Sequence, residues 1–349
     1  MKRISRPFSI LAALFAPVAL TTLLSCGHGK NIPDVSGVAV KDVVIERFDT
    51  AFFSLDSNHV QEGLYRLGER YPWFIQDFMA NILGAGPLSD TNRVAPQAAR
   101  QFLVSYRPVK DSIEEKYRNL GWLEKELQQG FRFVKYYFPN YHLPQKVVTF
   151  IGPFDGPGVA ITPYALAIGL QVYAGKDLSF YHSDKGMDMY PPYLSRRFEP
   201  AYITAGCMRT IAEDLQPDNT GSRPMIEQMI AKGKYGWLVD QFLPETADSI
   251  RTGYTQQQLN WCTSNEGLIW NYFLQNTDLY TVDPDIIKNY IGESPKTLGM
   301  PDASPGNIGA WIGRQIVKKY AAGHPDLSTE QILHTPERKI FDEAKYKPR

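Results

Sequence analysis

Cysteine is scarce in this sequence, and neither sign of charge is in excess. The chain has only three cysteines, and Cys26, Cys207 and Cys262 form no CxxC pair, which excludes common zinc-ribbon and thioredoxin-type motifs. Cys207 and Cys262 could pair in an oxidising compartment, but buried free thiols are at least as common, so no disulfide is predicted. Basic and acidic residues number 37 each. Without a basic excess, we expect no nucleic-acid partner.

The usual signatures of catalysis are also missing. No two of the six histidines are three or four residues apart, so the HExxH pair of zinc peptidases is absent. The sequence also lacks GxSxG, GxxxxGK[ST] and GxGxxG, which rules out the common nucleophile elbow, phosphate loop and dinucleotide fingerprint. We therefore predict neither a metal nor another cofactor, and no enzymatic activity.

The first 25 residues have the pattern of a secretory signal. Three basic residues precede an apolar run over 8–24, which is short for a membrane span because a span needs about 20 apolar residues. The run ends in Leu23-Leu24-Ser25-Cys26, which is similar to the bacterial lipobox. An ordinary signal peptide that happens to contain a cysteine is the alternative. We predict that residues 1–25 are a lipoprotein signal peptide and that acyl chains on Cys26 hold the protein on a membrane.

Removal of this signal leaves 324 of the 349 residues and changes the net charge from 0 to −3, because three basic and no acidic residues are lost. That length suffices for one large domain or two ordinary ones. Residues 26–41 mix Gly, Pro, Asn and Ser with little periodicity and are predicted to be a tether. Residues 42–145 form a helical N-terminal region. Residues 146–349 form a strand-containing, mostly helical region that packs with it as one compact unit.

Strands are predicted in three places. The segment VVIERFDTAFF alternates apolar and polar residues near its start, as a half-buried strand does. The segments KVVTFIG and YALAIGLQVYAG are continuous apolar runs, typical of buried strands, and the turn-rich PFDGPG separates them. These few strands among long helical patterns indicate an α+β fold that is mostly helical, with a small central sheet.

Helical patterns fill most of the remaining sequence. An apolar stripe runs from Leu120 to Phe138, and helices are predicted over 73–83, 203–215, 225–232 and 237–242. Thr255 with Gln258, and Ser328 with Gln331, have the spacing of capping boxes that begin helices. A further stripe on one helix face consists of Ile308, Trp311, Ile312, Gln315 and Lys319.

The segment LNWCTSNEGLIWNYFL raises a question about Glu266. Read as one helix, it places Glu266 on the same face as Cys262, Ile269, Trp270 and Phe273. A buried carboxylate is costly unless it is paired, hydrogen-bonded or bound to a metal. We expect Glu266 to be an interior anchor paired with an arginine or with backbone donors, rather than a catalytic group or a metal ligand. Trp261 and Trp270 beside it, and Trp311, are further candidate structural or binding residues.

The segment MYPPYLSRRFEP is a candidate recognition surface. Tyr190 and Tyr193 could stack on a peptide or a sugar, while Arg196 and Arg197 could bind a carboxylate. The alternative is a proline-rigidified loop packed on the sheet, with one arginine paired to an internal acid such as Glu266. Packing is favoured, since aromatic and arginine side chains also serve interior contacts.

Several long strings carry a family resemblance. The lipobox, VVIERFDTAFF, FYHSDKGMDMYPPYLSRRFEPAYI and GMPDASPGNIGAWIGRQIVKKY occur in this order, and the chain resembles gliding motility-associated lipoproteins of the GldB type over nearly its whole mature length. The resemblance implies a lipoprotein of the cell envelope that takes part in gliding where gliding occurs. It also implies a distant likeness to zincin-like metallopeptidases, so the fold could be a degenerate form of theirs that lacks HExxH.

These observations lead to one expected function and two alternatives. We expect a noncatalytic component of a gliding motility or secretion-related assembly, with envelope proteins as partners. No acidic run follows Cys26, so we expect the outer membrane, with the protein facing the periplasm. The alternatives are a metal-dependent, peptidase-like hydrolase with unrecognised ligands and a glycan- or peptide-binding lipoprotein.

Overall fold

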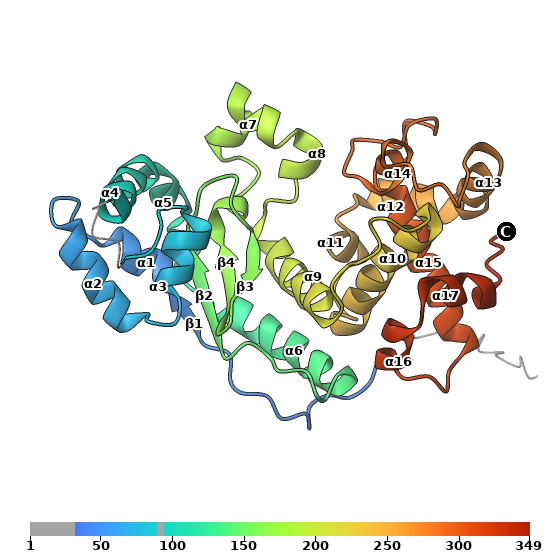
Figure 1. Ribbon diagram of the computed structural model, residues 1–349, viewed down its shortest axis with the longest axis horizontal. Helices are drawn as coiled ribbons and strands as arrows, with labels where there is room; N and C mark the ends of the chain where they lie inside the picture. Colours follow the sequence, from blue (N-terminus) through green and yellow to red (C-terminus); the bar gives the residue numbers. More distant parts are fainter. Residues whose placement is uncertain (1–31, 89–93) are drawn as a thin grey trace, which may run out of the picture. The chain divides into compact units, whose positions relative to one another are not determined.

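The computed structural model describes residues 32–88 and 94–349 (Figure 1). The predicted signal peptide and Cys26 lie outside the described residues. Residues from Asp34 onward form one compact unit. Val35 is 2% exposed, and Val38 and Val40 pack against the core. The part of the expected tether that follows Asp34 therefore belongs to the body, because its valines bury apolar surface there.

A four-stranded mixed sheet confirms the α+β prediction. Its order is β1-β2-β4-β3; β1, β2 and β4 run parallel, and β3 pairs antiparallel with β4. The strands are β1 (Ile45–Arg47), β2 (Lys146–Phe150), β3 (Val159–Ile161) and β4 (Ala165–Gly169). Every residue of β4 is buried, as a continuous apolar run predicts. The short β3 was not predicted, since three residues beside a turn-rich segment give no readable alternation.

The sheet separates two groups of helices. Figure 1 shows α1 to α5 on one side and α6 and α9 on the other. The helices that precede β2 are α1 (Phe48–Phe53), α2 (Val60–Arg70), α3 (Ile75–Asp77), the π-helix η1 (Phe78–Ile82), α4 (Val94–Ser105), α5 (Arg107–Ile113) and α6 (Gly121–Tyr137). Helix α6 also covers the free edge of β1, because Glu124 accepts a hydrogen bond of 3.0 Å from the backbone N–H of Ile45.

The region around α1 is packed with aromatic rings. Phe48 is fully buried and lies 5.3, 5.0 and 4.8 Å, between ring centroids, from Tyr71, Phe74 and Phe78. Two of these contacts are edge-on, the geometry that aromatic pairs prefer. The predicted helix over 73–83 begins later, at Ile75, and becomes the π-helix at Phe78. The aromatic side chains there serve core packing.

The remaining helices follow β4. They are the 3-10 helices η2 (Leu170–Val172), η3 (Ser179–His182) and η4 (Pro200–Tyr202), and the α-helices α7 (Asp184–Met189), α8 (Pro192–Ser195), α9 (Ile203–Leu215), α10 (Met225–Phe242), α11 (Asp248–Thr252), α12 (Gln256–Ser264), α13 (Glu266–Asn276), α14 (Pro284–Ile291), α15 (Ile308–Gly323), α16 (Thr329–His334) and α17 (Glu337–Ala344). Both predicted capping boxes begin helices, α12 and α16. The predicted bounds of α9 are confirmed.

Helix α10 corrects one prediction. The sequence indicated two helices, over 225–232 and 237–242; Gly233 and Gly236 lie between these segments. The structure has one continuous helix, and α15 makes its most extensive contact with it. A Cβ at Gly313 of α15 would lie 1.8 Å from the carbonyl oxygen of Met229. The glycines therefore permit close helix packing and do not end the helix.

The predicted stripe on α15 was also wrong in its second half. Gln315 is half-buried and Lys319 exposed, whereas Ile316, Val317 and Tyr320 are buried. Helix α15 contacts α10, α14 and α17, so most of its circumference is covered. A single stripe cannot describe a helix buried on several sides.

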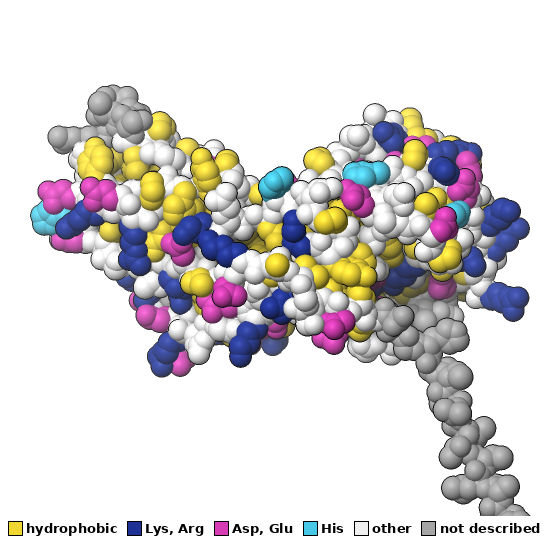
Figure 2. All heavy atoms as spheres, turned by 90° about the horizontal axis from the view of Figure 1, so that it is seen from below, with side chains coloured by type: hydrophobic (Ala, Val, Ile, Leu, Met, Phe, Trp, Pro, Cys, Tyr) yellow, Lys and Arg dark blue, Asp and Glu magenta, His cyan; other side chains and the backbone are white. Residues whose placement is uncertain are grey.

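Surface charge is mixed, as the balanced composition predicts. On the face shown in Figure 2, Lys and Arg side chains are interspersed with Asp and Glu, and no region of one sign dominates. Among the described residues, no helix combines the length and the apolar character that crossing a bilayer requires.

We predict that Gly313→Ala destabilises the protein by about 1–3 kcal/mol or more, because the added methyl group must push α10 away from α15. Gly323→Ala at the end of the same helix is the control, since a Cβ there would meet nothing within 4 Å. That control should leave stability unchanged or raise it slightly. Thermal unfolding of both variants tests this, and equal melting temperatures would contradict the close-packing argument.

Candidate functional site

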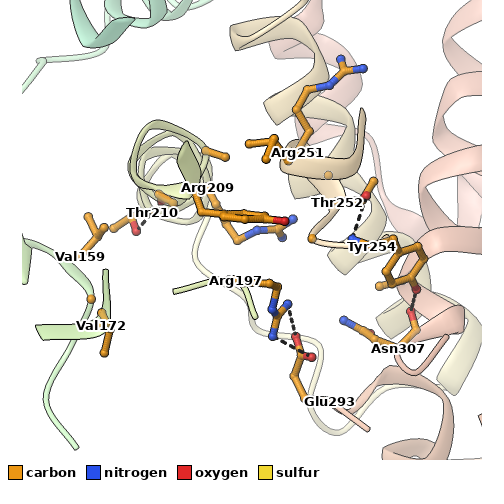
Figure 3. Close-up of a pocket in the computed structure, with 18 of the residues that line it drawn as sticks. Val159, Val172, Arg197, Arg209, Thr210, Arg251, Thr252, Tyr254, Glu293 and Asn307 are labelled. Atoms are coloured by element: carbon orange, nitrogen blue, oxygen red, sulfur yellow. Dashed lines mark hydrogen bonds and ion pairs between the residues drawn. The ribbon is translucent and has the colours of Figure 1, made fainter. Parts of the chain in front are cut away.

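A cavity of about 660 Å³ is the candidate functional site (Figure 3). Residues of α9, α10, α11 and α15 line it, together with the segments that follow β4, α8 and α14. Its volume is in the range of small-molecule binding sites. The cavity thus lies where the sheet-side helix α9 faces the C-terminal helices.

Tight backbone turns shape the cavity wall. Gly253 has φ +72° at the end of α11, and a Cβ there would lie 2.9 Å from Cδ of Arg197. The next residue, Tyr254, donates through its hydroxyl to the carbonyls of Gly306 and Asn307, at 2.8 and 3.1 Å. Asn307 itself has φ 56°, a left-handed conformation that asparagine tolerates better than most residues. These contacts fix the start of α15 against the turn after α11.

Two arginines that are adjacent in sequence, Arg196 and Arg197, bind different partners at this wall. Arg197 binds Glu293 through both guanidinium nitrogens, with Nη1–Oε1 at 3.2 Å and Nη2–Oε2 at 3.1 Å. This two-point geometry suits a planar carboxylate. Arg196 instead donates to the carbonyl of Gly253 at 2.6 Å. Burial and the neighbouring charge of Arg197 lower the pKa of Arg196. Arg197 alone of the two lines the cavity.

Arg209 lies on the opposite wall and is differently placed. It sits on α9, is half-buried, and its guanidinium points into the space that Arg197 also faces (Figure 3). Arg209 makes no hydrogen bond or ion pair with any residue that the structure describes. Burial lowers the pKa of Arg209, Glu213 and Glu293 oppose this shift, and Arg197 and Arg314 add to it. Arg209 is thus a cation that Glu213 and Glu293 influence through space but that has no ion pair within 4 Å among the described residues.

The third charged group of the wall is a buried network around Asp240 of α10. Asp240 is 5% exposed and accepts a hydrogen bond from Nε of Arg314 at 2.8 Å. Arg251 and Lys318 each approach it within 3.0 Å. Burial alone would raise the pKa of Asp240, but Arg314, Lys318 and Arg251 outweigh it and lower the pKa. Figure 3 shows Arg251 pointing away from the cavity, as its contact with Asp240 requires.

The potential nucleophiles in and near the cavity are engaged or protonated. Thr210 donates its hydroxyl to the carbonyl of Gly206 at 3.1 Å, and Thr252 donates to Asp248 at 2.7 Å. Cys207 and Cys262 are free and buried. Burial raises the pKa of the Cys207 thiol and raises that of Cys262 to about 12. Since thiolates are the reactive form, both thiols are inert at neutral pH.

The predicted recognition residues are partly brought together. Tyr190, Arg197 and Trp311 line the cavity, although Tyr190 also donates its hydroxyl to the carbonyl of Phe154. Tyr193 and Trp261 are half-buried and do not line it. Trp311 is 6% exposed, so most of its side chain belongs to the core.

Glu266 is not the interior anchor that the sequence predicted. The helix breaks at Asn265, so Glu266 begins α13 and is only half-buried. Its Oε1 accepts a hydrogen bond from the Tyr346 hydroxyl at 2.6 Å, so its partner is a tyrosine rather than an arginine. Trp270 is buried and packs edge-on against Tyr346, with ring centroids 5.2 Å apart. This cluster holds the C-terminal segment and is separate from the cavity.

Sequence reasoning missed the central cavity residues. Arg209 was visible as a single basic residue in the apolar stretch GCMRTIAEDL, and Arg314 similarly in GAWIGRQIV. A lone cation on an apolar helix face needs a counter-charge or a cavity. No local signal marks Glu293 or Asn307, because their partners are distant in sequence. Among the described residues, no group of three His, Cys, Asp or Glu side chains could hold a metal ion.

Comparisons with known proteins give one result. A family model described as gliding motility protein GldB matches residues 28–348. No curated protein and no solved structure matches the chain.

We predict that Asp240→Asn lowers the free energy of unfolding by about 3–5 kcal/mol at neutral pH, because it leaves the buried guanidinium groups of Arg251 and Arg314 with only the partly exposed Asp248 as a counter-charge. The folded-state pKa of Asp240 lies below its ordinary value of 3.8. Its contribution is therefore complete above that pH and is lost as the pH falls through the folded pKa. Between pH 5 and 3, wild type should lose more stability than the variant.

Asp302→Asn is the matched control, since Asp302 forms an exposed ion pair with Lys296 and its loss should be undetectable. Chemical denaturation across the pH series measures all three proteins. Parallel pH profiles for wild type and Asp240→Asn would refute the role given to this carboxylate.

Proposed function

This chain belongs to the family of gliding motility protein GldB, and on that premise we propose that it is a lipid-anchored envelope protein that acts by binding rather than catalysis. Family membership makes it a gliding motility-associated component. The proposal adds that acyl chains on Cys26 hold it on the outer membrane, facing the periplasm, and that other envelope proteins are its partners. The sequence support is the lipobox-like Leu23–Cys26 and the missing acidic run after it.

The noncatalytic part of this proposal rests on the hydroxyl and thiol groups in and near the cavity. The hydroxyls of Thr210 and Thr252 are bound to backbone carbonyls, and both thiols are buried and protonated. Nucleophilic catalysis needs the reverse, an exposed nucleophile with an adjacent base or a lowered pKa. A cavity with cationic and aromatic walls and engaged hydroxyls supports recognition of a ligand instead.

The Glu266 cluster supports the same proposal. A catalytic carboxylate would face a cavity, whereas Glu266 accepts a hydrogen bond from Tyr346 in a contact that holds the C-terminal segment. Burial and the carboxylate of Glu266 raise the pKa of Tyr346, so its hydroxyl stays protonated and donates the hydrogen bond. This arrangement supports a structural role for Glu266 without any proton transfer.

We predict that Glu266→Gln loses about 1 kcal/mol of stability, because an amide oxygen can still accept the Tyr346 hydrogen bond but without charge assistance. Glu266→Leu should lose about 1–3 kcal/mol, because it strands the hydroxyl of Tyr346. Tyr346→Phe is the partner control and should add little to Glu266→Leu in a double-mutant cycle. Function in a deletion strain should follow the amount of folded protein. A Glu266→Gln variant with wild-type melting but no complementation would revive the enzyme hypothesis.

We predict that Cys26→Ala leaves a folded body but releases it from the membrane fraction, because the body begins at Asp34 and does not include residue 26. His28→Ala, close to the acylated position, is the control and should remain membrane-bound. Fractionation with a high-salt wash separates lipid anchoring from electrostatic attachment. Retention of Cys26→Ala after the wash would contradict the anchor.

A further inference from the structure

The cavity is lined by more positive than negative side chains. Its acidic residues are Glu213 and Glu293. Its basic residues are Arg197, Arg209, Lys232, Arg251 and Arg314. Most of these cations already have a counter-charge: Arg197 binds Glu293, Lys232 lies 2.9 Å from Asp218, and Arg251 and Arg314 share Asp240. Arg209 is the cation of the cavity wall that has no ion pair within 4 Å among the described residues; Glu213 and Glu293 act on it only through space.

We propose that this cavity binds the phosphate group of a small molecule, with Arg209 as its principal ligand and Arg197 as a second ligand shared with Glu293. The inference concerns the described body alone and does not depend on the lipid anchor or on the gliding role.

The placement of Arg209 argues for an anion. A guanidinium removed from water is costly unless it is paired and hydrogen-bonded. Arg209 is half-buried at a cavity, its guanidinium has no partner among the described residues, and Arg197 faces the same space (Figure 3). Two cations that converge on one space repel each other until an anion lies between them. An oxyanion there would accept hydrogen bonds from both guanidinium groups.

The arrangement favours phosphate over carboxylate. A carboxylate is planar and is satisfied by one guanidinium fork, as Glu293 is by Arg197. A phosphate group presents three terminal oxygens and up to two negative charges. Its oxygens can therefore accept from more than one donor group, and Arg209 on α9 and Arg197 after α8 supply such groups on the wall of one cavity. The volume of about 660 Å³ leaves room for the rest of a small molecule beside Asn307 and Trp311.

Glu293 then acts as an internal competitor. Its side chain is 50% exposed and follows α14, while the Arg197 side chain is 25% exposed. An ion pair this open contributes little to stability, so an incoming phosphate can take over Arg197 at small cost. Removing the Glu293 charge should free Arg197 for the ligand and tighten its binding.

Inorganic phosphate is the first probe, added at constant ionic strength to protein purified from the envelope fraction in detergent. Isothermal titration calorimetry measures Kd, and thermal unfolding gives the shift in melting temperature. We expect phosphate to bind and stabilise wild type. Arg209→Gln should weaken phosphate binding at least tenfold, and without phosphate it should melt at or above wild type, because it removes an uncompensated cation. Glu293→Gln should bind phosphate more tightly than wild type.

Arg118→Gln is the control for a general loss of positive charge, since the Arg118 side chain is 72% exposed and outside the cavity; its phosphate Kd should equal that of wild type. If Arg209→Gln fails to fold, Glu293→Gln still tests the proposal. Phosphate binding by Glu293→Gln that is equal to or weaker than that of wild type overturns it. Absence of phosphate binding by wild type, or equal binding by Arg209→Gln, also overturns it. Equal stabilisation by acetate overturns the choice of phosphate.

Two further probes identify the source of the phosphate group. If glucose 6-phosphate binds more tightly than inorganic phosphate, and if this binding depends on Arg209, the site belongs to a soluble phosphorylated molecule. Arg209-dependent binding to vesicles that contain phosphatidic acid, whose headgroup is a phosphate monoester, with no gain for glucose 6-phosphate, assigns the site to a lipid headgroup. Both results uphold a phosphate site. If the Arg118→Gln variant also lost binding of glucose 6-phosphate or of the vesicles, the site would be overturned.

Discussion

Cations from two helices converge on one buried carboxylate, Asp240 of α10, and the C-terminal half of the protein is arranged around that contact. Arg314 and Lys318 come from α15, and Arg251 comes from α11. Without this carboxylate, only the partly exposed Asp248, which pairs with Arg251 and Arg314, would oppose the repulsion among these charges in a region of low dielectric constant. The contact also determines which cations of the cavity wall are paired within the protein and which are left to contact a ligand. Arg251 and Arg314 are drawn toward Asp240, whereas Arg209 on α9 is not.

Close backbone packing supports the same contact. Gly233 of α10 and Gly313 of α15 face each other so closely that side chains would overlap the opposite backbone. This approach brings Asp240, about two turns after Gly233, and Arg314, the residue after Gly313, within hydrogen-bonding distance. Electrostatics and shape thus act together, since larger residues at the glycines would separate the charges and leave each one buried alone.

The sequence predicted the features that are written locally and missed those that depend on distant partners. The buried strands, the capping boxes of Thr255 and Ser328, and the bounds of α9 follow from period and spacing. The break at Asn265 does not, because the residues on both sides continue a helical pattern. This break removed Glu266 from the interior. An apolar period cannot distinguish one bent helix from two.

The same distinction applies to the candidate site. Tyr190, Arg197 and Trp311 were named from residue type as candidate structural or binding residues, with packing favoured for the first two, and all three line the cavity. The partner of Arg197 is Glu293, 96 residues later, and no pattern along the chain connects them. Arg209 carried a signal, a single cation within an apolar helix, but its meaning depends on the cavity beside it. Residue types can suggest a binding surface, whereas the charge balance of a cavity requires the fold.

The two buried thiols make the body a favourable subject for site-specific labelling. Cys207 and Cys262 are buried, and burial raises the pKa of both, so maleimide reagents have no accessible thiolate to attack at neutral pH. A cysteine introduced on the exposed surface, for example at Arg118, would then be the reactive thiol of the described body. A fluorophore or spin label there could report on distances within the native protein without first replacing either natural cysteine.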